Sequence, residues 1–253
     1  MKNQSFFLLT LLLIGLYLPS TQAQVLTNRT VVKLNLSGVV INSYTLQVER
    51  VLNRHSSITL SGSYTPNNTP VPFKDALLNQ YGDNQDAKRA IETTLFNKKI
   101  GTLEYRFYLA GHAPTGWYLA PFVRYASMDI SNDYTYTPSD GILHHAHLNA
   151  SFSGGGAGVL LGYQWLFGKH IGLDLWLLGP FYGTQVKSTF TGEDPLWPSL
   201  KPADIIKLKN DIDNTKLPLY TVQSSLNLPT ITATLNGPYY GVRAFGLAFA
   251  YSF

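Results

Sequence analysis

Large apolar residues alternate with small or polar ones along several stretches of the chain, and this period of two is typical of β-strands. The clearest stretch is 239–253, in which Phe245, Leu247, Phe249, Tyr251 and Phe253 alternate with Ala, Gly and Ser. Its large residues share one face of a predicted strand, and its small residues share the other. This division suits a strand whose apolar face meets lipid while its small face packs inside a narrow closed barrel. Taken alone, the stretch also suits an amphipathic strand of an ordinary β-domain.

Seven further stretches show the same alternation. The predicted strands begin near Thr30, Tyr44, Ser57, Ile100, Trp117, Gly158 and Ile171. Three stretches break the pattern, and their Pro, Asn and charged residues predict long loops over 65–98, 128–152 and 191–237. The first of these loops has the apolar spacing for one short helix.

The order of the connections is a second source of evidence. Long loops all fall at one end of the predicted strands, and the tight turns all fall at the other. Short periplasmic turns, longer extracellular loops and an even number of strands are typical of outer-membrane proteins. We therefore predict an all-β fold, an eight-stranded antiparallel up-and-down transmembrane β-barrel with short periplasmic turns and long extracellular loops.

The N-terminal stretch has the features of a secretory signal. Lys2 precedes an apolar run over 6–18, and Thr21 and Ala23 occupy the small-residue positions of a cleavage site. We predict a signal peptide over 1–23, cleaved near Ala23, and a single barrel domain over 24–253. The absence of Cys excludes a lipid-attachment Cys and a disulfide framework.

The composition narrows the class of protein further. Charged residues make up 13% of the chain, against the roughly 25% that is usual in soluble domains. The sequence after the signal contains no apolar run of about 18 residues, so helical membrane spans are excluded. Only a closed barrel otherwise satisfies its backbone in a bilayer. We predict a location in the outer membrane of a Gram-negative bacterium, with its lipid as a partner and no nucleic acid, because the net charge of +4 is modest.

The inward faces of the predicted strands carry charged residues of both signs. These residues are Lys33, Glu49, Glu104, Arg106, Arg124 and Asp174. An eight-stranded barrel has an interior about wide enough for side chains alone, and unpaired buried charge is costly. We therefore predict an ionic network that fills the lumen and leaves no appreciable open pore; a proton or ion path is the alternative.

The end of the chain resembles the C-terminal signal of bacterial outer-membrane barrels. That signal is a final strand that ends in Phe and carries an aromatic residue two positions earlier, and Phe253 and Tyr251 match both positions. The resemblance implies that the barrel-assembly machinery is a partner.

No pattern in the sequence indicates catalysis or a cofactor. Ser, His and acidic residues occur in the predicted loops without the spacing of a nucleophile and its base, so we predict that the protein is not an enzyme. His144, His145 and His147 are spaced closely enough to bind Zn or Cu, but only Asp140 lies nearby to complete the ligands, and a solvated polar loop is favoured.

Several strand and turn patterns resemble an outer-membrane β-barrel family of Bacteroidetes-type bacteria that is catalogued as a domain of unknown function. The resemblance lies in the segments 33–36, 46–50 and 162–175. It covers most of the predicted mature chain and implies a barrel without a catalytic signature. The 191–237 stretch is long for that family.

Two classes of function remain open. The favoured one is a structural or surface-interaction role, in which the three long loops contact a surface ligand or protein. The alternative is a small-ligand-binding barrel with its site at the extracellular mouth of the lumen. Trp176 falls on the inward face, which supports the alternative, and Phe181 and Tyr182 would decide it by pointing into a cavity or out to lipid.

Overall fold

The described part of the protein is dominated by antiparallel β-strands. The computed structural model describes residues 30–82, 85–110, 112–136, 141–214 and 219–253. The predicted signal peptide, 1–23, lies outside the described residues. Within those ranges, no helix has the length and apolar character needed to span a membrane.

Strands make up most of the described chain, and the helices lie in the connections between strands. The strands are β1 (Thr30–Asn35), β2 (Tyr44–Val51), β3 (Ser56–Pro70), β4 (Leu95–Tyr108), β5 (Gly116–Tyr136), β6 (His144–Phe167), β7 (Ile171–Glu193), β8 (Thr221–Asn227), β9 (Thr230–Arg243) and β10 (Gly246–Ser252). The helices are α2 (Leu36–Val39), α3 (Lys74–Tyr81), α4 (Gln85–Thr93), the 3-10 helix η1 (Trp197–Ser199) and α5 (Pro202–Asp213).

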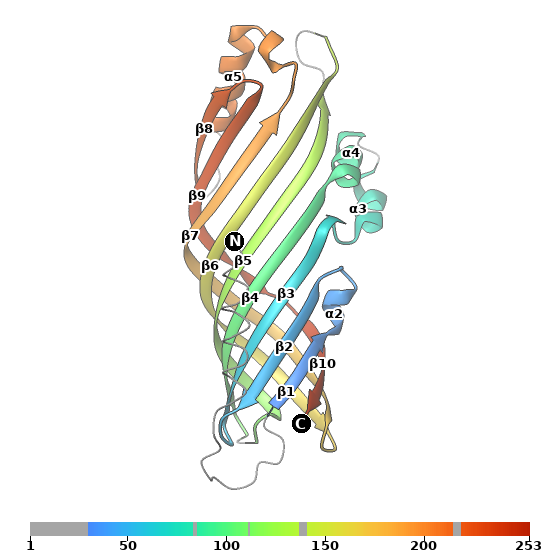
Figure 1. Ribbon diagram of the computed structural model, residues 1–253, viewed down its shortest axis with the longest axis vertical. Coiled ribbons are helices and arrows are strands. Elements are labelled where there is room, and N and C mark those ends of the chain that lie inside the picture. Colours follow the sequence, from blue (N-terminus) through green and yellow to red (C-terminus); the bar gives the residue numbers. More distant parts are fainter. Residues whose placement is uncertain (1–29, 83–84, 111, 137–140, 215–218) are drawn as a thin grey trace, which may run out of the picture.

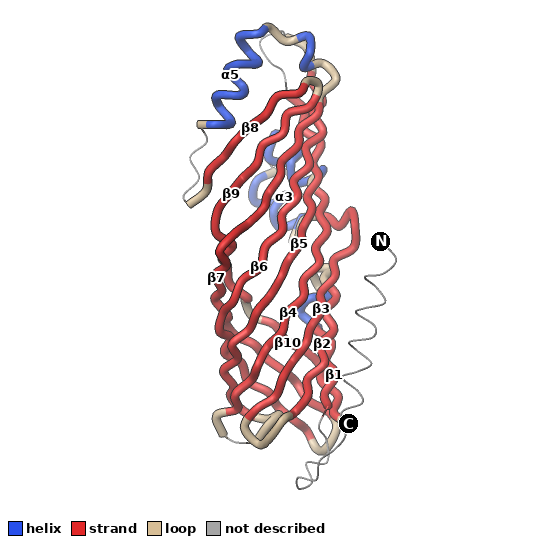
Figure 2. Tube along the Cα trace, turned by 60° about the vertical axis from the view of Figure 1, so that its left-hand side comes forward, coloured by secondary structure: helices blue, strands red, loops and turns tan. Residues whose placement is uncertain are grey.

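All strands belong to one antiparallel sheet that closes on itself (Figure 1). The strand order is β10-β1-β2-β3-β4-β5-β6-β7-β9-β8, and β10 also pairs with β7. Tyr251 on β10, for example, lies opposite Val32 on one side and Ile171 on the other. Figure 2 shows the tilted strands wrapping around the lower part of the molecule. In this lower part, each strand from β1 to β7 and β10 pairs with a neighbour on both sides, so the sheet has no free edge there.

The sheet has ten strands within the described ranges, whereas the sequence analysis predicted eight. One difference is that β9 and β10 replace a single predicted final strand. Both pair with β7, β9 along Gly179–Glu193 and β10 along Ile171–Trp176. Ala244 and Phe245 separate them. The other difference is β8, which pairs only with β9 at the upper end.

The three predicted long loops are largely wrong. β3 continues to Pro70, β5 and β6 form a hairpin paired as far as Tyr136 and His144, and 191–237 contains η1, α5, β8 and much of β9. These stretches were predicted as loops because their polar residues break the alternation of apolar and polar positions. Pairing with a neighbouring strand satisfies their backbone.

The outer face of the ring is apolar, with an aromatic belt at each end. The lower belt, near the tight turns, consists of Tyr105, Phe107, Trp117, Trp165, Phe167 and Tyr251, and the upper belt of Tyr44, Tyr64, Tyr125, Tyr182 and Tyr240, all exposed. Exposed aliphatic side chains such as Leu46, Leu103 and Val159 lie between the belts. Because Trp117 and Tyr125 are eight residues apart on β5, about 26 Å of strand separates the belts.

β10 closes the ring, and its last residues hold it to β1. The Phe253 amide donates to the Thr30 carbonyl over 2.9 Å, and the Thr30 amide donates back over 3.2 Å. We expect Phe253→Ser, which keeps these backbone bonds, to lower the amount of folded protein in the membrane, because the aromatic side chain is the predicted assembly signal. Heat-modifiable gel mobility of membrane fractions measures this amount.

The matched control for this prediction is Phe73→Ser. Phe73 is also an exposed aromatic residue, at 68%, but it precedes α3 in the β3–β4 connection. Wild-type levels of the Phe253→Ser protein, or an equal loss in the control, would count against a specific role for the terminal aromatic residue.

Candidate functional site

Charged side chains fill the lower interior of the ring. Lys33 on β1, Glu49 on β2, Glu104 and Arg106 on β4 and Asp174 on β7 are all fully buried. The strand alternation explains this placement, because the residues on either side of each one point outward. We call these five residues and Arg243 the ionic network.

Asp174 connects the two central cations of the ionic network. Its Oδ2 atom lies 2.6 Å from Lys33 Nζ and 2.7 Å from Arg106 Nη1. Lys33 Nζ also lies 2.7 Å from Glu49 Oε2, and Arg106 Nη2 lies 2.7 Å from Glu104 Oε2. The contacts therefore run across the ring from β1 and β2 to β4 and β7.

Neutral side chains add hydrogen bonds to the ionic network. The Tyr118 hydroxyl donates to Asp174 Oδ1 over 2.7 Å. Gln164 Oε1 accepts from Lys33 Nζ over 2.8 Å and from the Tyr108 hydroxyl over 2.9 Å. This matters because a buried charge is tolerated only when pairing and hydrogen bonding replace the water it has lost.

Five of the six inward charges named from the sequence come together in this way. The exception is Arg124, which lies higher on β5, half-buried, with its guanidinium 5.0 Å from the Phe181 ring centroid. In its place Arg243 on β9 forms an ion pair with Glu104 and lies 4.8 Å from the Trp176 ring centroid.

Sequence reasoning missed Arg243 because the alternation changes phase near the end of the chain. The inward residues of β9 are odd-numbered, such as Ile231 and Leu235, whereas those of β10 are even-numbered, such as Ala248 and Ala250. The break at Ala244 and Phe245 causes the change. A strictly periodic pattern carried back from the last strand therefore places Arg243 on the wrong face.

A packed apolar layer covers the ionic network. Phe122, Leu160 and Trp176 are at most 4% exposed. Phe181 packs against them, with its ring centroid 6.3 Å from that of Phe122. Trp176 and Phe181 thus point inward but fill space, while Tyr182 is exposed on the outer face. Of the three aromatic residues whose direction was to distinguish the two classes of function, two therefore fill this layer and one faces outward.

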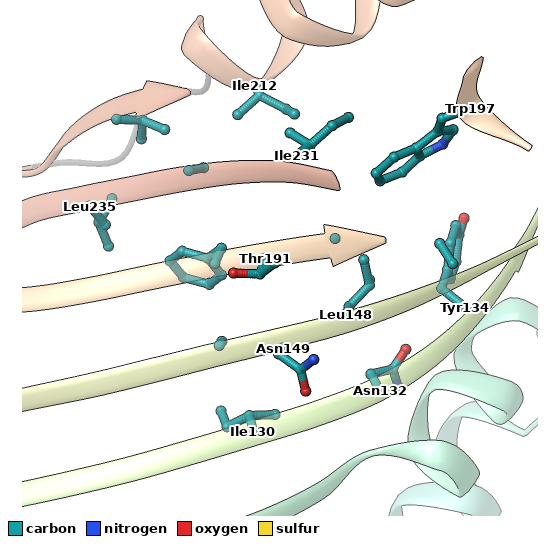
Figure 3. A pocket seen from close by; sticks show the side chains of 16 residues that line it. Ile130, Asn132, Tyr134, Leu148, Asn149, Thr191, Trp197, Ile212, Ile231 and Leu235 are labelled. Carbon is teal, nitrogen blue, oxygen red and sulfur yellow. The ribbon is translucent and has the colours of Figure 1, made fainter. Parts of the chain in front are cut away.

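An apolar pocket of about 580 Å³ lies higher, on the inner face of the upper sheet. Figure 3 shows side chains of β5, β6, β7 and β9 facing this space, with those of η1 and α5 on its other side. The lining includes Ile130, Leu148, Trp197, Ile212, Ile231 and Leu235. We call it the upper pocket, and η1 with α5 its roof.

Buried polar contacts fix the roof at its first end. His144 Nδ1 lies 2.7 Å from Asp194 Oδ2, and both side chains are almost completely buried. Asp194 Oδ1 accepts from the Leu196 amide over 2.8 Å. Trp197 then packs against Ala146 and neighbouring apolar residues.

Asp213 fixes the roof at its second end. Its Oδ1 atom accepts from the amide and the hydroxyl of Ser224 on β8, over 2.8 and 2.6 Å. Lys209, one turn earlier on α5, also donates to Asp213. The hydrogen bonds from Lys209 and Ser224 lower the pKa of Asp213 to about 2.

The three histidines do not converge on one point. His144 faces inward toward Asp194, His145 is exposed, and His147 Nδ1 lies 2.6 Å from Asp133 on the outer side. Asp140 lies outside the described residues. Among the residues that the structure does describe, no group of three His, Cys, Asp or Glu side chains could hold a metal ion.

The architecture defines an all-β protein with an unusual distribution of side chains, apolar on the outside of a closed ring and ionic at its centre. The chain belongs to the family described as Protein of unknown function (DUF3575), whose sequence profile matches residues 7–190. This match confirms the resemblance to a domain of unknown function, while the association with Bacteroidetes stays a prediction. No curated protein gives a significant match.

Several solved structures are similar to the chain at low sequence identity. CarO2 of Acinetobacter baumannii is 11% identical with a TM-score of 0.40, over 87% of this chain and 100% of that one. CarO of the same species is 12% identical with a TM-score of 0.40, over 86% and 100%. A major outer membrane protein from Thermus thermophilus is 14% identical with a TM-score of 0.35, over 90% and 100%.

The contacts of Asp174 in the ionic network predict how its replacement changes the free energy of unfolding. Asp174→Asn removes the carboxylate that Lys33 and Arg106 share and leaves two buried cations undercompensated. We expect a loss of about 3–5 kcal/mol in the free energy of unfolding, the usual cost of breaking a buried ion pair. Urea unfolding in lipid, followed by heat-modifiable mobility, measures it. Asp133→Asn is the control, since that side chain is 74% exposed, and a similar loss there would contradict the prediction.

The hydrogen bonds of Asp213 predict how the stability of the roof depends on pH. Because the pKa of Asp213 is lowered from 3.8 to about 2, its carboxylate stabilises the roof fully above about pH 4 and ceases to do so as the pH falls through about 2. We expect acrylamide quenching of Trp197, taken as the difference from a Trp197→Phe protein, to rise across this window. The Asp213→Asn protein should show no such titration, and an identical titration in both proteins would exclude Asp213 as its source.

Proposed function

We propose that this chain is an outer-membrane protein with a sealed lumen that binds a small ligand through an apolar part of that ligand in the upper pocket. The ring of β1 to β7 and β10 would be its membrane-spanning part, an eight-stranded barrel. The observation that carries the binding role is the upper pocket itself, an apolar space of about 580 Å³ on the inner face of the sheet.

The outer surface supports the membrane assignment. Two aromatic belts bound a band of exposed aliphatic side chains, the arrangement found on outer-membrane barrels with an apolar band about 25 Å tall. The tight turns around 52–55 and 168–170, and the described residues 109–110 and 112–115, lie at one end together with Thr30 and Phe253. That end would face the periplasm, and the upper pocket would face the exterior.

The ionic network and the apolar layer above it support a sealed lumen. Paired, fully buried charges occupy the centre of the ring, and the packed rings of Phe122 and Trp176 cover them. We therefore propose a closed barrel and neither a pore nor an enzyme, with β10 and Phe253 presented to the barrel-assembly machinery.

The size and lining of the upper pocket support ligand binding over a surface-interaction role. Ligand pockets usually measure about 300–1,000 Å³ and are mostly apolar, and this one fits both criteria. The surface-interaction role rested on three long loops, but much of their sequence forms strands and helices. The alternative weighed in the sequence analysis, a site at the mouth of the lumen, is therefore the one we favour.

A sealed lumen predicts the absence of ion conduction. Purified protein in planar bilayers should show no stable single-channel conductance. A variant in which Phe122 and Trp176 are both replaced by Ala tests whether the apolar layer contributes to the seal in addition to the ionic network. Stable wild-type channels would contradict the sealed lumen.

The binding role predicts that filling the upper pocket blocks a ligand. Ala150 on β6 lines the pocket, and its neighbour Ser151 points to the other face and is exposed. We expect Ala150→Trp to weaken binding of a neutral naphthylamine probe by about tenfold, roughly 1.4 kcal/mol, and Ser151→Trp to leave it unchanged. Energy transfer from Trp197, corrected with a Trp197→Phe protein, reports binding in nanodiscs. Failure of the wild-type protein to bind would overturn the proposal.

A further inference from the structure

A second, smaller space continues the upper pocket downward. It measures about 280 Å³ and includes Lys98 and Tyr239 in its lining, and Leu235 lines both spaces. On β5, Met128 lines the lower space and Ile130 the upper one. These are consecutive inward positions of one strand, so a single inner surface leads from the apolar pocket down to Lys98.

Positive charge collects at the bottom of this surface. Lys98 on β4 lies opposite Met128, and Arg124 lies two inward positions lower on β5. The positive charge of Arg124 acts unfavourably on Lys98, and Arg124 itself interacts unfavourably with Arg243 and favourably with Glu104 below it. Neither has a carboxylate within ion-pair distance in the part of the chain that the structure describes, and Arg124 Nε is buried without a hydrogen-bond partner.

The carboxylates of the ionic network are already engaged. Glu49, Glu104 and Asp174 contact Lys33, Arg106 and Arg243. Lys98 and Arg124 are therefore additional positive charges inside the ring. Unpaired charge in a partly buried site is costly. The positive charges of Lys98 and Arg124 would therefore stabilise an anion bound beside them.

Ser188 offers a further polar contact at the same level. Its side chain is fully buried, lines the lower space and has no hydrogen-bond partner for its hydroxyl. In contrast, the far end of the upper pocket is closed by apolar groups such as Trp197 and Ile212. The polar residues that line the upper pocket, such as Asn132, Asn149 and Thr191, are uncharged. Among the described lining residues, a positive charge is thus available at the lower end alone.

We propose that the ligand is a single-chain amphipathic anion such as a long-chain alkyl carboxylate. Its tail occupies the upper pocket beneath the roof, and its head group contacts Lys98 and the Ser188 hydroxyl, with Arg124 contributing positive charge from below. This inference rests on the proposed binding role and adds the chemistry of the ligand. The packed layer of Phe122, Phe181 and Trp176 stops the head group from reaching the ionic network.

The test compares two probes that differ only in their head groups. One is a long-chain alkyl carboxylate and the other is the alcohol of equal chain length, both brominated on the chain to quench Trp197. Binding is measured in nanodiscs at mildly alkaline pH, with a Trp197→Phe protein as background. We expect the wild-type protein to bind the carboxylate about tenfold more tightly, because its charged head group accepts hydrogen bonds that the alcohol forms less strongly.

The matched variants are Lys98→Met and Lys99→Met. Both remove one positive charge, but Lys99 is exposed on the outer face. We expect Lys98→Met to abolish the preference for the carboxylate without changing alcohol binding, and Lys99→Met to keep the preference. Arg124→Met should reduce it partly.

The outcomes separate this inference from the binding role. Equal binding of both probes by the wild-type protein would overturn the anionic ligand and leave the apolar pocket in place. Binding of neither probe would overturn both proposals. If Lys98→Met does not fold, as judged by heat-modifiable mobility, the ratio of the two wild-type affinities still decides the question.

Discussion

The structure depends on the buried ionic network. Asp174 is shared by Lys33 and Arg106, so strands far apart in the sequence are joined through one carboxylate. Burying an ion costs several kcal/mol, and only complete pairing and hydrogen bonding offset that cost. The network therefore requires the ring to close around it with β1, β2, β4 and β7 in register. It also explains why the interior at this level holds side chains and leaves no channel.

The upper half of the molecule differs from the closed ring below it. β1 and β2 end early, whereas β5, β6 and β7 continue far above them (Figure 1). Beyond the end of the short strands the sheet is open on one side, and its inner face becomes apolar. η1 and α5 cover part of that face, held by Asp194 and Asp213. The upper pocket is thus a consequence of unequal strand lengths above a sealed ring.

The two levels of the interior differ in charge balance. In the ionic network every described carboxylate contacts a cation, as Glu104 contacts Arg106 and Arg243. One level higher, Lys98 and Arg124 add two positive charges on the inner face, and no described carboxylate lies within ion-pair distance of either. Since the packed layer of Phe122 and Trp176 separates the levels, positive charge above the layer is available to a ligand, while the charges below it serve stability.

The sequence by itself determined the all-β class, the outward apolar faces and the inward position of Lys33, Glu49, Glu104, Arg106 and Asp174. It could do so because side-chain direction alternates along a strand whatever its neighbours are. The tertiary structure alone decided where the strands end, since polar stretches such as 128–136 become strand only through pairing with a distant partner. It also decided the inward position of Arg243, because the break at Ala244 and Phe245 reverses the alternation. Ile130, Trp197 and Leu235 line the upper pocket together although they are far apart in the sequence. No local sequence pattern predicts that these residues lie close together.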